Sequence, residues 1–283
     1  MTAARYHPDV KSITLASGLT LPYVESGARD GEPVIFLHGY TDAWPSWQRV
    51  LAHLPTTLRA FAISQRGHGH ADKPATGYAP VNMAEDLADF MNALRIDRAI
   101  IVGHSMGSVI AQHFAERHAD RVTGMVLVGA LRGYGGNPAI EELGEFIASL
   151  TEAPDEGFIR EFQRSTLAQP VPAAFFEAMV AESLQVPLHV WRAGMTEFLA
   201  AKPATRFDAP TLTIWGDQDS ISPHADQMAL MRLLPDVRLI VYRGQGHAPH
   251  WESPDRFADD VAAFCNECAR LARRARHFDK EAA

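Results

Sequence analysis

Cysteine is scarce in this 283-residue sequence, which contains only Cys265 and Cys268. Two thiols cannot form the disulfide framework of a small secreted domain. Their C-x-x-C spacing occurs in metal and redox sites, but no second cysteine or histidine pair accompanies it to complete a zinc site. Both thiols instead fall on an apolar stripe at helical spacing, together with Phe257, Val261, Phe264 and Leu271. We therefore expect them to be core side chains, and we expect no metal and no cofactor.

Long apolar runs and positive charge are also in short supply. No apolar run approaches the length needed to span a bilayer, and the stretch MTAARYHPDVKS lacks a basic segment followed by an apolar one. With 34 acidic and 26 basic residues, the formal net charge of -8 disfavours binding to nucleic acid or to an anionic membrane. The sequence therefore predicts a cytoplasmic globular protein whose partner is a small-molecule substrate, and it carries no signal for an oligomeric state.

Short apolar segments alternate with helical patterns along most of the chain. Most of the segments are rich in Val and Ile without polar alternation, which is typical of strands buried on both faces of a parallel sheet. They cover residues 34–37, 60–64, 99–102, 125–128, 211–215 and 237–242. Upstream, residues 11–15 and 19–25 predict an antiparallel hairpin at the sheet edge. In the helical pattern between the second and third segments, Asn82 and Glu85 are spaced like a capping box and predict the helix start.

The alternation of strands and helices stops between residues 131 and 205. Several glycines and Pro138 open this part of the chain, and its large apolar residues keep helical spacing until strands resume after Pro210. The sequence therefore predicts an α/β core formed by residues 1–130 and 206–283. Residues 131–205 are expected to form a helical insertion that lies over the sheet.

The apolar segment 99–102 ends in an unusual pentapeptide, Gly103-His104-Ser105-Met106-Gly107. Its serine stands where a predicted strand turns directly into a predicted helix. Such a sharp turn exposes the central side chain and brings the residues two before and two after it close together. Only glycine lacks the Cβ that would collide there. This G-x-S-x-G pattern in its strand-to-helix context predicts that Ser105 is a nucleophile.

A serine nucleophile needs a base to remove its proton and a carboxylate that fixes the tautomer of the base. The predicted strand 211–215 is followed by Asp217 and Asp219, and the strand 237–242 by His247 and His250. Because the carboxyl ends of parallel strands meet at one edge of a sheet, these side chains are expected near Ser105. The residues alone leave two candidates for the acid and two for the base.

Five stretches, in this order, resemble the motifs of lid-bearing α/β-hydrolases, a group with esterases, lactonases, C–C bond hydrolases, cofactor-free haloperoxidases and epoxide hydrolases. They are Phe36-Leu37-His38-Gly39-Tyr40, Arg66-Gly67-His68-Gly69, Gly103-His104-Ser105-Met106-Gly107, Trp215-Gly216-Asp217-Gln218-Asp219 and Gly246-His247-Ala248-Pro249-His250-Trp251-Glu252. The resemblance covers nearly the whole chain. It implies an α/β-hydrolase fold with a mostly parallel, eight-stranded sheet flanked by helices and a helical cap inserted after strand 6.

The resemblance also implies roles for individual residues. Ser105 matches the nucleophile and His247 the base, and the family pattern G-x-x-D selects Asp219 as the acid. The oxyanion-binding groups match the backbone N–H groups of Tyr40 and Met106. The substrate pocket is expected to include Tyr40, Trp191, Arg192 and Ala248. Three further histidines are expected to have structural roles: His38, His104 and His250.

These roles imply a serine hydrolase that cleaves a carboxylic ester or lactone of a small, partly apolar substrate through an acyl-enzyme. Epoxide hydrolysis is disfavoured because those enzymes attack with a carboxylate at the position of Ser105. Three functions stay open: C–C hydrolysis of a vinylogous diketone, cofactor-free oxidative chemistry and ligand reception without catalysis. The C–C hydrolases hold a dienoate carboxylate with a lid arginine and a tryptophan directly after the catalytic histidine. Here Arg192 is the candidate arginine, and Ala248 replaces the tryptophan.

Overall fold

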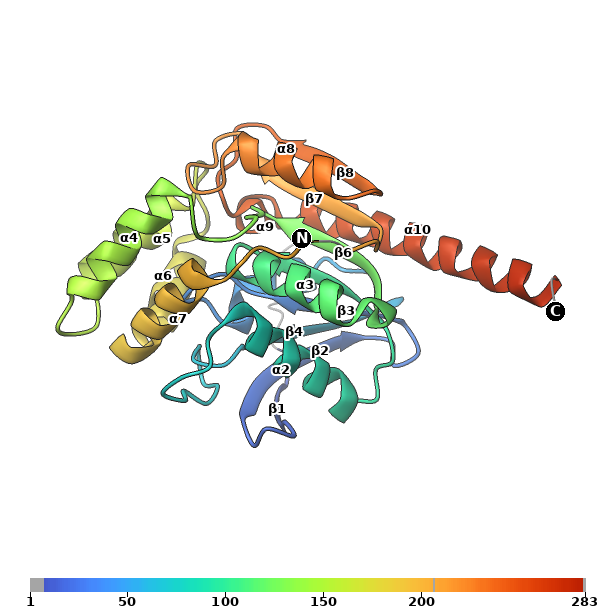
Figure 1. Cartoon of the computed structure of the whole chain (residues 1–283), viewed down its shortest axis with the longest axis horizontal. Coiled ribbons are helices and arrows are strands. Elements are labelled where there is room, and N and C mark those ends of the chain that lie inside the picture. Colours follow the sequence, from blue (N-terminus) through green and yellow to red (C-terminus); the bar gives the residue numbers. More distant parts are fainter. Residues whose placement is uncertain (1–7, 206, 282–283) are drawn as a thin grey trace.

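The chain folds around one eight-stranded sheet. The computed structural model describes residues 8–205 and 207–281, with side chains as far as Leu271. Its strands are β1 (Val10–Thr14), β2 (Thr20–Gly27), β3 (Glu32–Leu37), β4 (Leu58–Ile63), β5 (Ala99–His104), β6 (Val122–Val128), β7 (Thr211–Gly216) and β8 (Val237–Tyr242). They lie in the order β1-β2-β4-β3-β5-β6-β7-β8 (Figure 1). The pairs β1–β2 and β2–β4 are antiparallel and the others parallel, which confirms the expected sheet and hairpin.

Both faces of the central strands are buried, which explains why β3, β5, β6 and β7 contain long apolar runs, whereas the edge strands β1 and β8 are partly exposed. In β3, Ile35 and Leu37 enter one core, whereas Val34 and Phe36 enter the other. The first face is covered by α2 (Pro80–Ala93), α3 (Met106–Arg117) and α8 (His224–Leu233), and the second by α1 (Gln48–Leu51) and α10 (Pro254–Glu281). Short turns of helix lie at η1 (Trp44–Trp47), η2 (Ala119–Arg121) and α9 (Pro249–Glu252). Cys265 and Cys268 are buried in the second core, as expected for packing groups.

The expected capping box at the start of α2 is wrong. The helix begins at Pro80, two residues before Asn82, and its N-cap is Ala79. Proline suits the first helical position because it has no N–H group to satisfy and its φ is already helical. The N–H of Ala79 donates to the Glu197 carboxylate at 2.6 Å. The start of α2 is thus set by proline and by a long-range hydrogen bond rather than by a local cap.

Four helices separate β6 from β7: α4 (Pro138–Ser149), α5 (Glu156–Ser165), α6 (Ala173–Leu184) and α7 (Leu188–Ala200). We call them the inserted helices. They fall within the range 131–205 in which a helical insertion was expected, and Figure 1 shows them at one end of the sheet. Arg206, where the predicted core resumes, lies outside the described residues, as do positions 1–7 and 282–283. Three of the inserted helices, α4, α5 and α7, face the carboxyl ends of the parallel strands and close a pocket against them.

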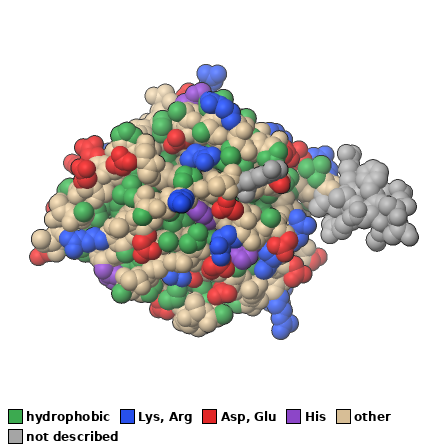
Figure 2. Space-filling model, viewed as in Figure 1, with side chains coloured by type: hydrophobic (Ala, Val, Ile, Leu, Met, Phe, Trp, Pro, Cys, Tyr) green, Lys and Arg blue, Asp and Glu red, His purple; other side chains and the backbone are tan. Residues whose placement is uncertain are grey.

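The outer surface is mixed in charge. Figure 2 shows acidic and basic side chains interspersed over the viewed face. Among the helices in the described ranges, none combines the length and the apolar character that crossing a membrane requires.

Candidate active site

Ser105 stands at the junction of β5 and α3 with φ 49° and ψ -111°. A residue other than glycine rarely adopts a positive φ, so this backbone is strained. The turn is tight: a Cβ at Gly103 would lie 2.3 Å from the carbonyl oxygen of Gly107, and a Cβ at Gly107 would lie 2.3 Å from that of Leu37. Both glycines are therefore required sterically, and the turn directs Ser105 into the pocket beneath the inserted helices.

His247 and Asp219 follow β8 and β7 at the same edge of the sheet. The Nδ1 atom of His247 lies 2.8 Å from Oδ2 of Asp219. The other oxygen of Asp219 accepts hydrogen bonds from the backbone N–H groups of Ile221 and Ser222, each at 2.8 Å. The carboxylate is thus fixed in place and orients the imidazole. Asp217, the other candidate, instead accepts a hydrogen bond from the N–H of Gly244 at 2.6 Å and braces the loop.

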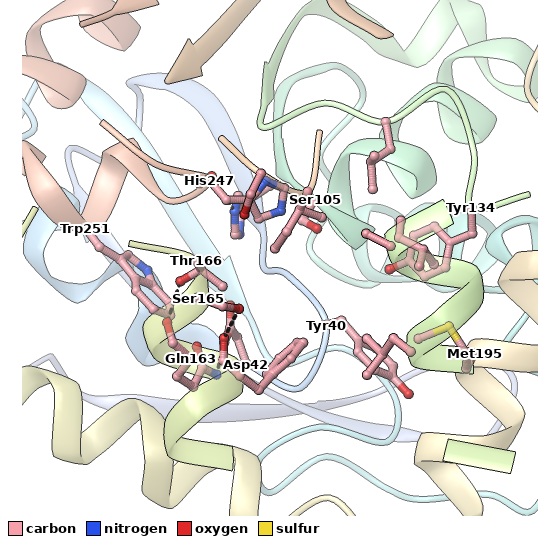
Figure 3. Close-up of a pocket in the computed structure, with 18 residues that line it drawn as sticks. Tyr40, Asp42, Ser105, Tyr134, Gln163, Ser165, Thr166, Met195, His247 and Trp251 are labelled. Carbon is pink, nitrogen blue, oxygen red and sulfur yellow. Dashed lines mark hydrogen bonds between the residues drawn. The ribbon is translucent and has the colours of Figure 1, made fainter. Parts of the chain in front are cut away.

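The second ring nitrogen of His247 faces the pocket region that contains Ser105. Its Nε2 atom is buried and has no hydrogen-bond partner within the described part of the chain. Figure 3 shows His247 and Ser105 side by side, and both line the pocket. A base whose Nδ1 is oriented by a carboxylate and whose Nε2 is open toward a serine is the arrangement that nucleophilic acyl transfer requires.

The other buried histidines of this region pack instead of pairing with an acid. The ring centroid of His250 lies 4.4 Å from those of Trp47 and His104. His38 accepts a hydrogen bond at Nε2 from the N–H of Gln65 at 3.0 Å. Burial lowers the pKa of His38, His104 and His250 well below the usual 6.5, so all three are neutral at pH 7. Among the described residues, no group of three or more His, Cys, Asp or Glu side chains could hold a metal ion.

The backbone N–H groups of Tyr40 and Met106 are the two that were expected to bind an oxyanion. Met106 is the first residue of α3, where the N–H groups of a helix have no partner within the helix. Tyr40 directly follows the loop after β3, and its ring lines the pocket. Neither N–H donates to another residue in the described ranges. The Tyr40 hydroxyl donates to the carbonyl oxygen of Trp191 at 2.6 Å, which fixes the ring against α7.

The pocket has a volume of about 260 Å³ and two chemically different ends. In Figure 3, Asp42, Gln163 and Thr166 lie on one side of Ser105, while Tyr134 and Met195 lie on the other. Further apolar lining comes from Leu131, Ala139, Ile140, Leu143, Phe162 and Ile221. Pockets for small molecules usually enclose roughly 300 to 1,000 Å³, so this volume fits a small substrate.

Of the four residues expected in the pocket wall, the structure places only Tyr40 there, and the other three are corrected. Trp191 lies behind Tyr40, with ring centroids 5.1 Å apart. Ala248 is buried against Met179 and Trp251. Arg192 is exposed and donates to the carbonyl oxygens of Ala148 and Leu150, which lie at the C-terminal end of α4. Free carbonyl groups at a helix end attract arginine, and this keeps Arg192 away from the pocket.

Several lining residues were not expected from the sequence, above all Asp42 and Gln163. Asp42 stands two residues after Tyr40, so its place near the predicted oxyanion site could have indicated that it lines the pocket. Gln163 gave no such indication, because a polar residue on a helix becomes notable only when its distant partner is known. It donates to Asp42 at 3.0 Å across 121 positions of sequence.

We expect Gly107→Ala to lower the free energy of unfolding by about 1 to 3 kcal/mol. The new Cβ would lie 2.3 Å and 2.8 Å from the backbone oxygens of Leu37 and His38, which cannot move aside as a side chain can. Urea denaturation measures the loss. The matched control is Gly144→Ala, where the Cβ meets flexible side chains instead of backbone, Cδ1 of Leu199 at 2.7 Å and Cγ of Met195 at 3.3 Å, and its stability should stay within about 1 kcal/mol of the parent. Equal stability of both variants would contradict the tight turn.

Comparisons with known proteins agree with this architecture. The family profile described as alpha/beta hydrolase fold matches residues 32–254. The chain is 30% identical to a non-heme chloroperoxidase of Streptomyces lividans over 281 residues, covering 89% of this chain and 98% of the relative. It is 28% identical to 2-hydroxymuconate semialdehyde hydrolase of Pseudomonas sp. (strain CF600), covering 94% and 98%. The solved structure of an esterase from Rhodococcus sp. ECU1013 superposes with a TM-score of 0.80 at 26% identity, covering 91% and 98%. The chain therefore belongs to the α/β-hydrolase fold family.

Proposed function

We propose that this chain is a serine hydrolase that cleaves a carboxylic ester or lactone of a small, partly apolar substrate through an acyl-enzyme. One observation carries the proposal: Ser105, on a strained turn, shares a pocket with His247, whose other ring nitrogen lies 2.8 Å from Asp219. The chemistry needs no cofactor. The similarity to a solved esterase at 26% identity supports the same class of reaction.

The mechanism follows from these positions. The hydroxyl oxygen of Ser105 attacks the substrate carbonyl carbon while Nε2 of His247 takes its proton. Asp219 holds Nδ1–H and stabilises the imidazolium that forms. The N–H groups of Tyr40 and Met106 donate to the oxygen on which negative charge develops. His247 then gives the proton to the leaving alcohol oxygen, and the acyl group stays on Ser105.

The second half of the reaction reverses these roles with water. His247 takes a proton from a water molecule, whose oxygen attacks the acyl carbon. When the new tetrahedral intermediate collapses, the C–O bond to Ser105 breaks and the serine oxygen regains a proton from His247. The carboxylic acid leaves, and for a lactone substrate the product is a hydroxy acid.

The charge of the pocket favours an ester over a dienoate. C–C hydrolysis of a dienoate needs a cation for the substrate carboxylate, yet among the described lining residues there is no Lys or Arg. Arg192 is engaged with α4, and the pocket wall contributes the carboxyl group of Asp42. A carboxylate facing a second buried carboxyl group gains nothing and is repelled when both are ionised. We therefore place C–C hydrolysis second, although a relative at 28% identity carries a semialdehyde hydrolase name.

A substrate panel tests the proposal. We expect measurable turnover of p-nitrophenyl esters with short and medium acyl chains, and little turnover of a 2-hydroxy-6-oxo-dienoate. Because Arg192 is exposed outside the pocket, Arg192→Ala should cost ester hydrolysis less than about tenfold in kcat/KM, or roughly 1.4 kcal/mol. Absorbance assays of p-nitrophenol release and dienoate loss give both rates. Dienoate cleavage far faster than any ester, abolished in Arg192→Ala, would replace the ester proposal with C–C hydrolysis.

Oxidative chemistry is the other candidate, since a non-heme chloroperoxidase is 30% identical to this chain. The same substrate panel distinguishes oxidative chemistry from ester hydrolysis, because hydrolysis through an acyl-enzyme proceeds without any oxidant. Ester turnover that depends on added peroxide would favour the oxidative function instead.

A further inference from the structure

Asp42 is a buried carboxyl group in the pocket wall for which the proposed mechanism has no use. Its side chain lines the pocket, although the residue is only 2% exposed. The residue before it, Thr41, has a φ of 67° and is fully buried. Its hydroxyl lies 2.9 Å from the Ser183 hydroxyl on α6, which ties this turn to the inserted helices. A strained turn that is tied to an inserted helix and presents a carboxyl group to a pocket indicates function.

The amide of Gln163 anchors this carboxyl group. Its Nε2 atom donates to Oδ1 of Asp42 at 3.0 Å and to the Ser183 hydroxyl at 2.8 Å, so both amide protons are used (Figure 3 draws the first bond). A carboxylate has room for about four hydrogen bonds. The backbone of Gly39 also lies against this carboxyl group and lowers its pKa. Asp42 therefore retains acceptor capacity on the wall of the pocket.

The hydroxyl groups beside Asp42 also act as acceptors toward the pocket. Ser165 donates its proton to the carbonyl oxygen of Phe162, and Thr166 donates to that of Gln163, each at 2.7 Å. A hydroxyl has one proton, so only lone pairs of these two oxygens remain. Figure 3 shows both residues on the Asp42 side of the pocket. This end thus offers acceptors to a substrate group that can donate.

Trp251 supplies one donor at the same end. It lines the pocket, is 1% exposed, and its indole N–H has no hydrogen-bond partner in the described part of the protein. A buried donor without a partner is costly, so a ligand that accepts from it gains affinity. A hydroxyl group can donate to Asp42 and accept from Trp251 at once, whereas an ammonium group can only donate.

We infer that Asp42, together with Trp251, is a specificity determinant that recognises a hydroxyl group of the substrate. The substrate is then a hydroxy-substituted ester or lactone, and its apolar part lies on the side of Tyr134 and Met195. This inference rests on the proposed ester hydrolysis, since it names which ester the same site selects.

Ionisation of Asp42 makes the selectivity pH-dependent. Burial raises the pKa of this carboxyl group from 3.8 to about 7, partly offset by the Gln163 amide and by His247, while Glu182 of α6 raises it further. Above neutral pH the group is a carboxylate and accepts more strongly, so selectivity for the hydroxylated substrate should increase between pH 6 and pH 8. Any pH dependence that the two substrates share cancels in the ratio of their rates.

The experiment compares p-nitrophenyl 3-hydroxypropanoate and 6-hydroxyhexanoate, which do not readily close to five- or six-membered lactones, with the alkyl esters of equal length, and hydroxyalkyl acetates with alkyl acetates. In the parent, kcat/KM for at least one hydroxylated member should exceed that of its alkyl partner by about tenfold or more at pH 8. This kcat/KM ratio should fall toward unity when the parent is assayed at pH 6. In Asp42→Asn it should be near unity at both pH 6 and pH 8. Trp251→Phe should lower it as well.

A charge control separates a hydrogen bond from a general field effect. Glu182→Gln removes the neighbouring negative charge without touching the pocket lining, and its ratio at pH 8 should stay within about twofold of the parent. An equal fall of the ratio in Glu182→Gln and Asp42→Asn would overturn the role of Asp42. A p-nitrophenyl ω-aminoalkanoate turned over faster than its hydroxyl counterpart would assign the site to an ammonium group instead.

The outcomes distinguish this inference from the proposed function. If the parent hydrolyses esters but the kcat/KM ratio of hydroxylated to alkyl ester stays near unity at pH 6 and at pH 8, the hydroxyl site is wrong. The proposed hydrolase function is then unaffected. Hydrolysis of neither series by the parent removes the proposed function and the inference with it. The pH comparison uses only the parent chain, so it decides the matter even where Asp42→Asn fails to fold.

Discussion

Ser105→Ala is expected to lower kcat for p-nitrophenyl ester hydrolysis by about 10⁴ to 10⁶ while the protein stays folded. The serine oxygen is the atom to which the acyl group is transferred, so its loss removes the covalent route and leaves only the contribution of the oxyanion-binding groups and of substrate binding. Stability should change little, because the backbone N–H and carbonyl of Ser105 make the hydrogen bonds that hold the turn. Steady-state rates and thermal unfolding measure the two quantities.

Covalent labelling gives the same prediction an independent readout. A fluorophosphonate should add once to the parent chain, at Ser105, and not at all to Ser105→Ala. Ser165 and Ser220 also line the pocket and serve as internal controls within the digested peptide map. A label on either of these two serines, or full activity in Ser105→Ala, would remove Ser105 from the role of nucleophile.

Much of the sheet could be predicted from the sequence because burial on both faces leaves a direct trace in it. Segments such as 99–102 and 125–128 contain apolar residues at successive positions, and only a strand covered on both sides needs that. The start of α2 could not be predicted in the same way. Asn82 and Glu85 have the right spacing for a cap, but Pro80 begins the helix earlier and Glu197 satisfies the preceding N–H from a distant helix.

The arrangement of Ser105, Asp219 and His247 was predictable because each residue follows its own parallel strand. Strand order alone brings such residues to one edge, whatever the remaining chain does. The pocket wall depends instead on how the inserted helices are placed. Trp191 and Arg192 are adjacent in α7, yet one is buried behind Tyr40 and the other reaches the end of α4. No local pattern in the sequence encodes that geometry.

Asp219→Asn is expected to lower kcat by about 10⁴, whereas Asp217→Asn should cost less than about tenfold. The two carboxyl groups stand two positions apart on one loop, so the same substitution tests geometry alone. Oδ2 of Asp219 lies 2.8 Å from Nδ1 of His247 and selects the tautomer whose Nε2 can take a proton. An amide N–H at that oxygen's position would favour the opposite tautomer, with its proton on Nε2.

The Asp217 carboxylate has a different partner, the N–H of Gly244 at 2.6 Å, and an asparagine oxygen can still accept that bond. Asp217→Asn should therefore lose little activity at every pH. Steady-state kcat values for one p-nitrophenyl ester, measured in both variants at equal stability, decide between the two residues. Equal losses would mean that the carboxylate acts through the loop rather than through His247, and the larger loss in Asp217→Asn would move the acid to position 217.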